Sequence, residues 1–138
     1  MKKQSTAWSP HTDPYHLSQN PATPVAVLEQ LAENDCVWVR RYVAMNRSTP
    51  AAVLERLADD DSGIVLTGVG GNPSTPAAAL ERLAADDLVA CAALMADIRL
   101  PVAGNPSTPA AVLERLAADN NARVRAAAAG NPSTPQRP

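Results

Sequence analysis

Apolar residues recur along this chain in short blocks that share one spacing. In residues 51–58, Leu54 and Leu57 lie three positions apart, and Ala58 extends the same face of a helix. The two charged residues between the leucines point away from that face. Close copies of the block follow at three other places: 25–32, 77–84 and 110–117. Each copy predicts a helix of about two to three turns, with leucines toward a core and charges toward solvent.

A second, weaker apolar pattern follows each block. Two aligned columns, four residues apart, are apolar in every copy: Val39, Val65, Ile98 and Val124 in one, and Val43, Val69, Val102 and Ala128 in the other. A separation of four keeps both columns on one face of a helix. Glycine then follows at 71, 104 and 130, where a helix would stop. Each unit is therefore expected to contain one regular helix and one shorter, weaker helix.

The motif Asn-x-x-Thr-Pro separates these units. It occurs five times: at 20–24, 46–50, 72–76, 105–109 and 131–135. The spacings of 26, 26, 33 and 26 residues describe a 26-residue repeat with one seven-residue insertion in the third copy. The Thr is expected to cap the first helix by accepting from its free N–H groups, and the Pro to occupy the first helical position. Because two short helices cannot bury an apolar face alone, neighbouring repeats must stack.

The full pattern, Asn-Pro-x-Thr-Pro-x-x-x-Leu-x-x-Leu-Ala-x-Asp followed by Val-Arg and Val-Ala, resembles the variant leucine-rich repeat (LRV) family over about residues 16–135. The resemblance implies an all-α, right-handed helical repeat solenoid, in which α-helices alternate with short, 3₁₀-like helices and there is no β-sheet. Some members carry a cysteine-rich iron–sulfur module before the repeats. Because the first 35 residues here contain no Cys, that module does not carry over, and no cofactor is expected.

The repeats predict three parts of the chain. Residues 1–19 form a polar N-terminal segment that ends in a partial cap. Residues 20–130 form four repeats with an insertion near 88–97, and residues 131–138 begin a truncated fifth repeat.

Both ends of the predicted stack raise the question of what covers them. Leu17 falls in the column of Val43, so the residues around it look like a preceding half-repeat, with Trp8 or Tyr15 folded over it. At the other end, the fourth repeat has an open face. That face either pairs with another copy or a partner, or tolerates exposure because residues 126–129 are all alanine.

The insertion carries nine consecutive apolar residues, Leu88–Ala96, between acidic residues. A helix that is apolar all round exceeds what one face of a thin stack covers. The surplus predicts a contact surface for a partner or a second copy, formed by Leu88, Val89, Leu94 and Met95. The alternative is a longer second helix whose alanines face solvent.

The second half of the second repeat, residues 62–71, is rich in glycine and is a poor helix former. Gly68 and Gly70 either let the helix of the third repeat approach closely or mark a frayed repeat.

Composition and charge exclude several classes of protein. The chain has 46% hydrophobic residues but no Phe, so its core must be built from Leu, Val and Ala. A net charge of −2 argues against a dedicated nucleic-acid binder. No apolar run reaches the roughly 18 residues of a membrane span, and residues 1–10 lack the apolar core of a secretory signal. Cys36 and Cys91 fall in different repeats, too far apart for a disulfide, which favours a cytoplasmic location.

Catalytic motifs are scarce. The two histidines, His11 and His16, would need two further ligands to hold zinc, and no Cys lies near them. The glycine-rich segment does not match a phosphate loop, and no nucleophile elbow occurs. We therefore expect neither an enzyme nor a metal site.

Two charged columns remain. One pairs Glu29, Glu55, Glu81 and Glu114 with neighbouring arginines, and we interpret it as a solvated face with three i,i+4 ion pairs: Arg56–Asp60, Arg82–Asp86 and Arg115–Asp119. The other is a stripe of Arg40, Arg99 and Arg125, which suits an anionic ligand.

The leading hypothesis is a non-enzymatic helical repeat scaffold that binds another protein or a second copy of itself, with no membrane contact. The alternative is a solenoid that binds nucleic acid or phosphate through the arginine stripe. This alternative is weaker because the later repeats have no aromatic side chains on which bases could stack.

Overall fold

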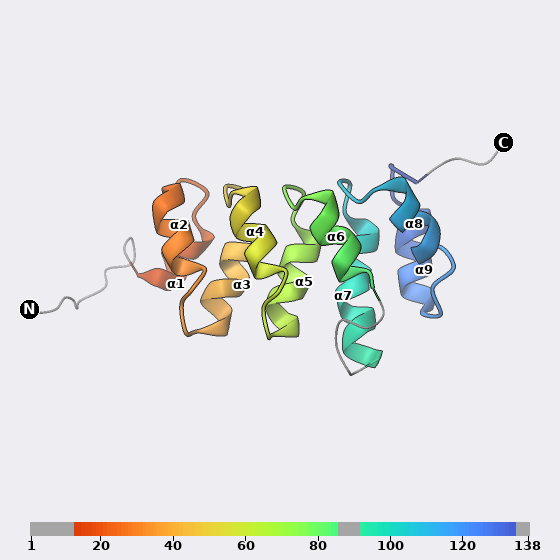
Figure 1. The fold of residues 1–138 in the computed structure, drawn as a ribbon, viewed down its shortest axis with the longest axis horizontal. Coiled ribbons are helices and arrows are strands. Elements are labelled where there is room, and N and C mark those ends of the chain that lie inside the picture. The colour runs from red at the N-terminus through yellow and green to blue at the C-terminus, as the bar shows by residue number, and fades with distance from the viewer. Residues whose placement is uncertain (1–12, 86–91, 135–138) are drawn as a thin grey trace, which may run out of the picture.

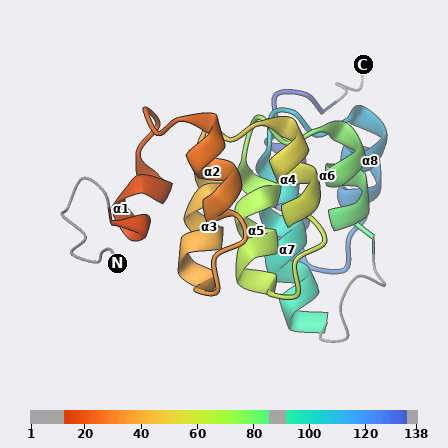
Figure 2. The same cartoon turned by 60° about the vertical axis from the view of Figure 1, so that its left-hand side comes forward.

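The computed structural model describes residues 13–85 and 92–134, and these form nine α-helices and no strand. The helices alternate between two layers (Figures 1 and 2). Layer A consists of α2 (Val25–Leu31), α4 (Ala51–Leu57), α6 (Ala77–Leu83) and α8 (Ala110–Leu116). Layer B consists of α1 (Pro14–Gln19), α3 (Val37–Met45), α5 (Gly63–Gly71), α7 (Ala92–Gly104) and α9 (Ala122–Ala129). The all-α prediction is confirmed for these residues.

The core lies between the two layers. Helices of layer B pack directly against each other in the order α1, α3, α5, α7 and α9, and each layer A helix packs on the B helices beside it. The predicted apolar columns are buried: Leu54 and Leu80 from layer A and Val43 and Val69 from layer B have no exposed surface. The row is elongated, with α1 and α9 at opposite ends (Figure 1).

The second helix of each unit is not the short, 3₁₀-like element that was expected. α3 and α5 are α-helices of nine residues and α9 has eight, whereas each layer A helix has seven. The physical reason is packing. α3 and α5 are covered by layer B helices on both sides as well as by layer A, and α9 is covered by α7 and α8, so tertiary contacts extend these helices despite their weaker local signals.

The positions and hydrogen bonds of the Thr and Pro of the motif also differ from the prediction. Pro50 and its equivalents are the N-cap residues, and none of the four layer A helices has a side-chain cap. Thr49 instead donates its hydroxyl to the carbonyl of Val43, at 2.6 Å, and Thr75 donates to that of Val69, at 2.7 Å. Each of these carbonyls lies at the end of a layer B helix and accepts one backbone N–H, that of Asn46 or Asn72, and the buried threonine hydroxyl supplies a second donor.

The asparagine of each motif joins one repeat to the preceding one. Asn72 donates through Nδ2 to the carbonyl oxygens of Ala44, at 2.7 Å, and Asn46, at 3.0 Å, and its Oδ1 accepts from the N–H of Ser74. The same pair of bonds recurs at every described junction, and we call its donors the asparagine ladder: Asn46, Asn72, Asn105 and Asn131. All four side chains are buried.

The glycine-rich segment forms the nine-residue helix α5, and two of its glycines permit close contacts on both sides. A Cβ at Gly68 would lie 3.1 Å from the Cβ of Ala44 on α3, and one at Gly70 would lie 3.0 Å from Cγ2 of Val102 on α7. Of the two alternatives given for these glycines, close approach of the third repeat is correct for Gly70. Gly68 instead permits the close approach of α3.

Replacing Asn72 with Ala should lower the free energy of unfolding by about 2 kcal/mol, because the buried carbonyl of Ala44 loses its donor and that of Asn46 keeps only the N–H of Thr49. Urea denaturation followed by circular dichroism measures the change. Asn20→Ala is the matched control, since Asn20 is exposed and its side chain binds the N–H of Ala22 within its own turn. An equal loss in both variants would contradict the role of the ladder.

Gly70→Ala should destabilise the fold by about 1–2 kcal/mol, because the added methyl group meets the fully buried Val102. Gly104→Ala should instead be neutral or stabilising by up to about 1 kcal/mol, because no atom lies within 4 Å of the added Cβ. Urea denaturation of the pair separates the packing cost from the gain in helix propensity. A stabilised Gly70→Ala variant would refute the close contact.

Candidate functional site

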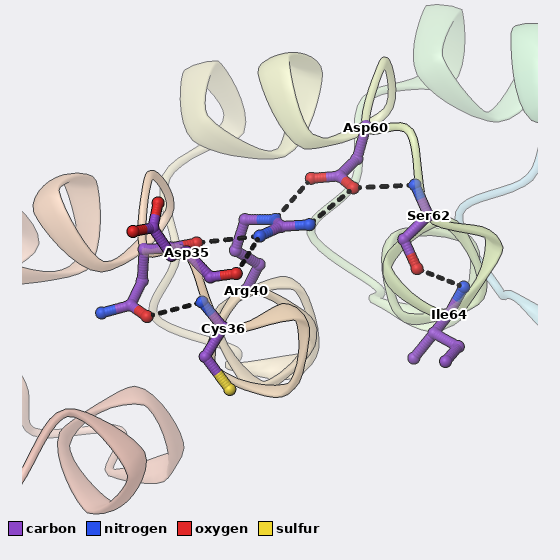
Figure 3. A network of polar contacts seen from close by, with 7 residues as sticks. Asp35, Cys36, Arg40, Asp60, Ser62 and Ile64 are labelled. Atoms are coloured by element: carbon purple, nitrogen blue, oxygen red, sulfur yellow. Dashed lines mark hydrogen bonds and ion pairs between the residues drawn. The ribbon is translucent and has the colours of Figure 1, made fainter.

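The first residue of the predicted arginine stripe lies in an ion pair between repeats. Arg40 on α3 binds both carboxylate oxygens of Asp60, with Nε 2.8 Å from Oδ2 and Nη2 3.3 Å from Oδ1 (Figure 3). Its Nη1 donates to the carbonyls of Asn34 and Asp35, at 2.8 and 3.2 Å. The hydrogen bond to Asp60 raises the pKa of Arg40. This guanidinium therefore connects the first and second repeats.

Asp60 makes another hydrogen bond in the same network, to the turn that precedes α5. Its Oδ1 accepts from the backbone N–H of Ser62, at 2.9 Å, and Ser62 in turn caps α5 by accepting from the N–H of Ile64 (Figure 3). The carboxylate thus fixes the turn that begins α5 while holding the arginine of α3.

The third and fourth repeats reproduce this arrangement. Arg99 on α7 binds Asp119 with Nε–Oδ2 and Nη2–Oδ1 distances of 2.6 and 3.1 Å, and each side chain is only 8% exposed. Burial raises the pKa of Asp119, but the hydrogen bonds from Arg99 and from the N–H of Asn121 outweigh it, so this pKa lies below its usual range. The pair is a buried, charge-assisted link between repeats.

Arg125 occupies the same column in α9 but in different surroundings. Its Nη1 donates to the carbonyl of Asp119, at 2.7 Å, as Arg40 does to that of Asn34. Its side chain is exposed, and the described residues provide no carboxylate to it. In the second repeat, the column holds the buried Leu66. The structure therefore places Arg40 and Arg99 inside the stack and does not bring the three arginines together on one open surface.

Charged residues of layer A also pair between repeats. The expected Arg56–Asp60 and Arg115–Asp119 pairs are wrong, because both aspartates bind layer B arginines. Arg56 instead reaches Glu33, and Arg82 reaches Glu55, each at 3.1 Å. In both pairs, the glutamate belongs to the repeat that precedes the repeat of the arginine. All of these groups are largely exposed, so each pair contributes little to stability. Asp86, the expected partner of Arg82, lies outside the described residues.

Three large exposed apolar side chains of layer B lie on the neighbouring helices α3 and α5. Trp38 and Met45 on α3 are each 47% exposed, and Ile64 on α5 is 36% exposed. Arg41, between the first two, donates through Nη1 to the carbonyl of Ile64, at 2.9 Å, and to Oγ1 of Thr67, at 2.8 Å. We call these five residues the α3/α5 surface. The guanidinium of Arg41 therefore links α3 to α5.

Sequence reasoning missed this surface, although the column of Trp38 contained a signal. Trp38 aligns with Ile64, Asp97 and Arg123, and two charged members indicate a solvent-facing position. The aromatic residues were instead assigned to an N-terminal cap.

Of the two residues predicted to fold over Leu17, the structure describes only Tyr15. Tyr15 on α1 packs edge-on against Tyr42 on α3, with ring centroids 5.1 Å apart and hydroxyl oxygens 3.2 Å apart. The hydrogen bond with Tyr42 raises the pKa of Tyr15. The carbonyl of Leu17 accepts from Thr23 as that of Val43 does from Thr49, so α1 repeats the end of a layer B helix. Trp8 lies outside the described residues.

The predicted apolar contact surface falls at the edge of what the structure describes. Leu88 and Val89 lie outside the described residues, while Leu94 and Met95 belong to the first turn of α7. By repeat alignment, α5 and α9 begin where Ala96 stands, so α7 begins four residues earlier. This extra turn projects beyond the ends of the neighbouring layer B helices (Figure 1).

Two further findings concern chemistry. Cys36 is exposed and unpaired, and Cys91 lies outside the described residues. Within residues 13–85 and 92–134, no group of three or more His, Cys, Asp or Glu side chains is placed to hold a metal ion, and no helix is long and apolar enough to cross a membrane.

Asp119→Asn should lower the free energy of unfolding at neutral pH by about 3 kcal/mol, because the buried Arg99 loses the carboxylate that it binds through two charge-assisted hydrogen bonds. Since folding lowers the pKa of Asp119, its ionised form stabilises the fold above the pKa of an unfolded aspartate, about 4, and this contribution is lost as the pH falls further. Urea denaturation at neutral pH and below pH 4 should therefore show a weaker acid effect in the variant.

The control for this measurement is Asp35→Asn, which neutralises an exposed aspartate. It should leave both the stability at neutral pH and the acid effect close to those of the unmodified chain. If the acid effect of Asp119→Asn equalled that of the control, the buried ion pair would not be the source of the pH dependence.

Comparison with known proteins bears on the repeat itself. No curated protein and no solved structure matches the chain. Residues 37–62 match the family model of the leucine rich repeat variant. The matched segment runs from the start of α3 through α4 to the N-cap of α5, and it contains both Arg40 and Asp60. The resemblance seen in the sequence is thereby confirmed, and the chain carries a repeat of the leucine rich repeat variant family at residues 37–62.

Proposed function

We propose that this chain is a non-enzymatic scaffold, built as a right-handed helical solenoid, that binds another protein in the cytoplasm. The partner is either a different protein or a second copy of the chain. A helical repeat protein of this kind presents an extended surface whose shape is fixed by contacts between neighbouring repeats. The exposed thiol of Cys36 is in keeping with a reducing compartment.

The observation that carries the proposal is the α3/α5 surface. Exposed Trp and Met are enriched at the centres of protein interfaces, where a few large side chains provide most of the binding energy. Here Trp38 and Met45 lie seven residues apart on one helix, with Arg41 between them, and Arg41 binds the carbonyl of the exposed Ile64 on α5. Because Arg41 bridges both helices, the surface is already organised before a partner binds.

The projecting turn of α7 extends the proposal to the predicted apolar segment. We propose that Leu88, Val89, Leu94 and Met95 form a second contact surface, since the first turn of α7 projects beyond the ends of the neighbouring layer B helices (Figure 1). The arginine stripe gives the nucleic-acid alternative no comparable support, because the carboxylates of Asp60 and Asp119 already bind Arg40 and Arg99.

Substitution of the exposed apolar residues tests the proposal. We expect the immobilised chain to capture a defined protein from an extract of its source cells. Trp38→Gln and Met45→Gln should each reduce that capture at least fivefold, because they remove apolar contact area without opening the core. A Leu94→Glu/Met95→Glu double variant tests the α7 turn in the same experiment. Quantitative mass spectrometry of the captured protein gives the readout.

Val25→Gln is the matched control, because Val25 is 48% exposed but lies on α2 in layer A. It should capture as much as the unmodified chain. Circular dichroism and thermal denaturation must show that every variant keeps its helices. Equal capture by all variants, or capture that follows thermal stability alone, would overturn the proposal.

A further inference from the structure

Arg41, in the middle of the α3/α5 surface, keeps part of its guanidinium open to a ligand. Its Nη1 donates to the carbonyl of Ile64 and to Oγ1 of Thr67, which uses both N–H groups of that nitrogen. Its Nε and Nη2 donate to no group among the described residues. Because no buried side-chain nitrogen in the described part of the chain lacks a hydrogen-bond partner, these two nitrogens reach solvent. One edge of the guanidinium is therefore fixed by α5, and the other is accessible.

The neighbouring Arg40 shows which group fits the accessible edge. Arg40 is also anchored through Nη1, by two backbone carbonyls, and its Nε and Nη2 bind the two carboxylate oxygens of Asp60 (Figure 3). Arg99 holds Asp119 through the same two nitrogens. A planar guanidinium and a carboxylate match in this geometry, because two hydrogen bonds form side by side. The accessible edge of Arg41 therefore suits a carboxylate.

Exposed apolar side chains lie on both sides of Arg41 along α3. Trp38 lies three residues before it and Met45 four residues after it, so all three share one face of the helix. A partner that covers the two apolar side chains would also exclude water from the guanidinium. Because ion pairs are stronger where water is excluded, the surface favours a carboxylate that lies between apolar side chains of the partner.

The charges around the surface limit what else it could bind. α5 contains no charged residue, and Arg40 on α3 is neutralised by its ion pair. Exposed carboxylates border the surface: Asp35 and Asp61 lie just before α3 and α5 begin, and Asp97 lies on the adjacent α7. These carboxylates repel a polyanion such as a nucleic acid, which would extend across the whole face. A peptide with a single carboxylate at Arg41 avoids that repulsion.

We propose that the α3/α5 surface binds a peptide segment of its partner in which an Asp or Glu lies between apolar side chains. The carboxylate binds Nε and Nη2 of Arg41, and the apolar side chains pack on Trp38 and Met45. This inference rests on the proposed function and names the chemistry of the partner at that surface.

Peptide selection tests this chemistry. Random peptides displayed on phage are selected on the immobilised full chain. We expect enrichment of sequences with an Asp or Glu between apolar residues. Arg41→Glu should lose this preference and select Lys or Arg instead, because the sign of the central charge is reversed. Selection of no peptide, or of peptides without an acidic residue, would overturn the proposal.

A double-mutant cycle with one selected peptide separates Arg41 from the net charge of the chain. Replacing the acidic residue of the peptide with its amide should weaken binding about tenfold on the unmodified chain, because charge-assisted hydrogen bonds are lost. The same replacement should have little effect on Arg41→Gln. Isothermal titration calorimetry measures the four affinities. Because the readout is a difference between two peptides on each chain, a general weakening caused by loss of the link to α5 cancels.

Arg47→Gln is the matched control for this cycle. Arg47 is exposed and lies two residues beyond the end of α3, so its replacement removes the same charge from outside the proposed contact. This variant should keep the difference between the two peptides. If Arg47→Gln lost the difference, or if Arg41→Gln retained it, the proposed carboxylate contact would be refuted. Circular dichroism must show that each variant keeps its helices.

The failure of this inference can be told from the failure of the proposed function. If capture of a partner protein depends on Trp38 but is unchanged in Arg41→Gln, the surface is an interface and only the carboxylate contact is refuted. If a selected acidic peptide binds through Arg41 but no captured protein depends on Trp38, the proposed function fails instead. Sedimentation velocity covers the remaining occupant: a dimer of the chain alone that is lost in Trp38→Gln would assign the surface to a second copy and overturn the proposal.

Discussion

The bond between an asparagine amide and two carbonyls of the preceding repeat is the constraint on which this structure depends. At the end of α3, the carbonyl of Ala44 has no backbone donor, and the next repeat passes close enough to bury it. Asn72 supplies two N–H donors to that position and uses its oxygen to fix its own turn through Ser74. One side chain thus ends a helix, shapes a turn and sets the register between two repeats.

The remaining contacts follow from that register. Once the layer B helices lie side by side, their facing surfaces must be small, which accounts for Ala44, Gly68 and Gly70. The same register places Arg40 opposite Asp60 and Arg99 opposite Asp119. It also fixes which side chains stay outside, and so the α3/α5 surface, with Trp38 at its edge, results from how the repeats stack.

The errors of the sequence-based predictions share a cause. Thr49, Asp60 and the short second helices were all interpreted within one repeat, as a cap, an i,i+4 partner and a weak local element. In the folded chain, each is decided by a neighbour in space: the carbonyl at the end of a helix, an arginine of another repeat, and the helices on both sides of layer B. Local rules describe one helix well, but in a stack the adjacent repeat supplies partners that compete with those on the same helix.

The sequence by itself determined the helical class, the position of each repeat and the apolar columns that form the core, because burial of a helix face requires a periodic pattern that is visible in one dimension. It also contained the aspartates and arginines of the junctions, without their pairing. The tertiary structure decided which of them meet and which aromatic side chain remains exposed. Both depend on distances between repeats that lie 20 or more residues apart in the chain.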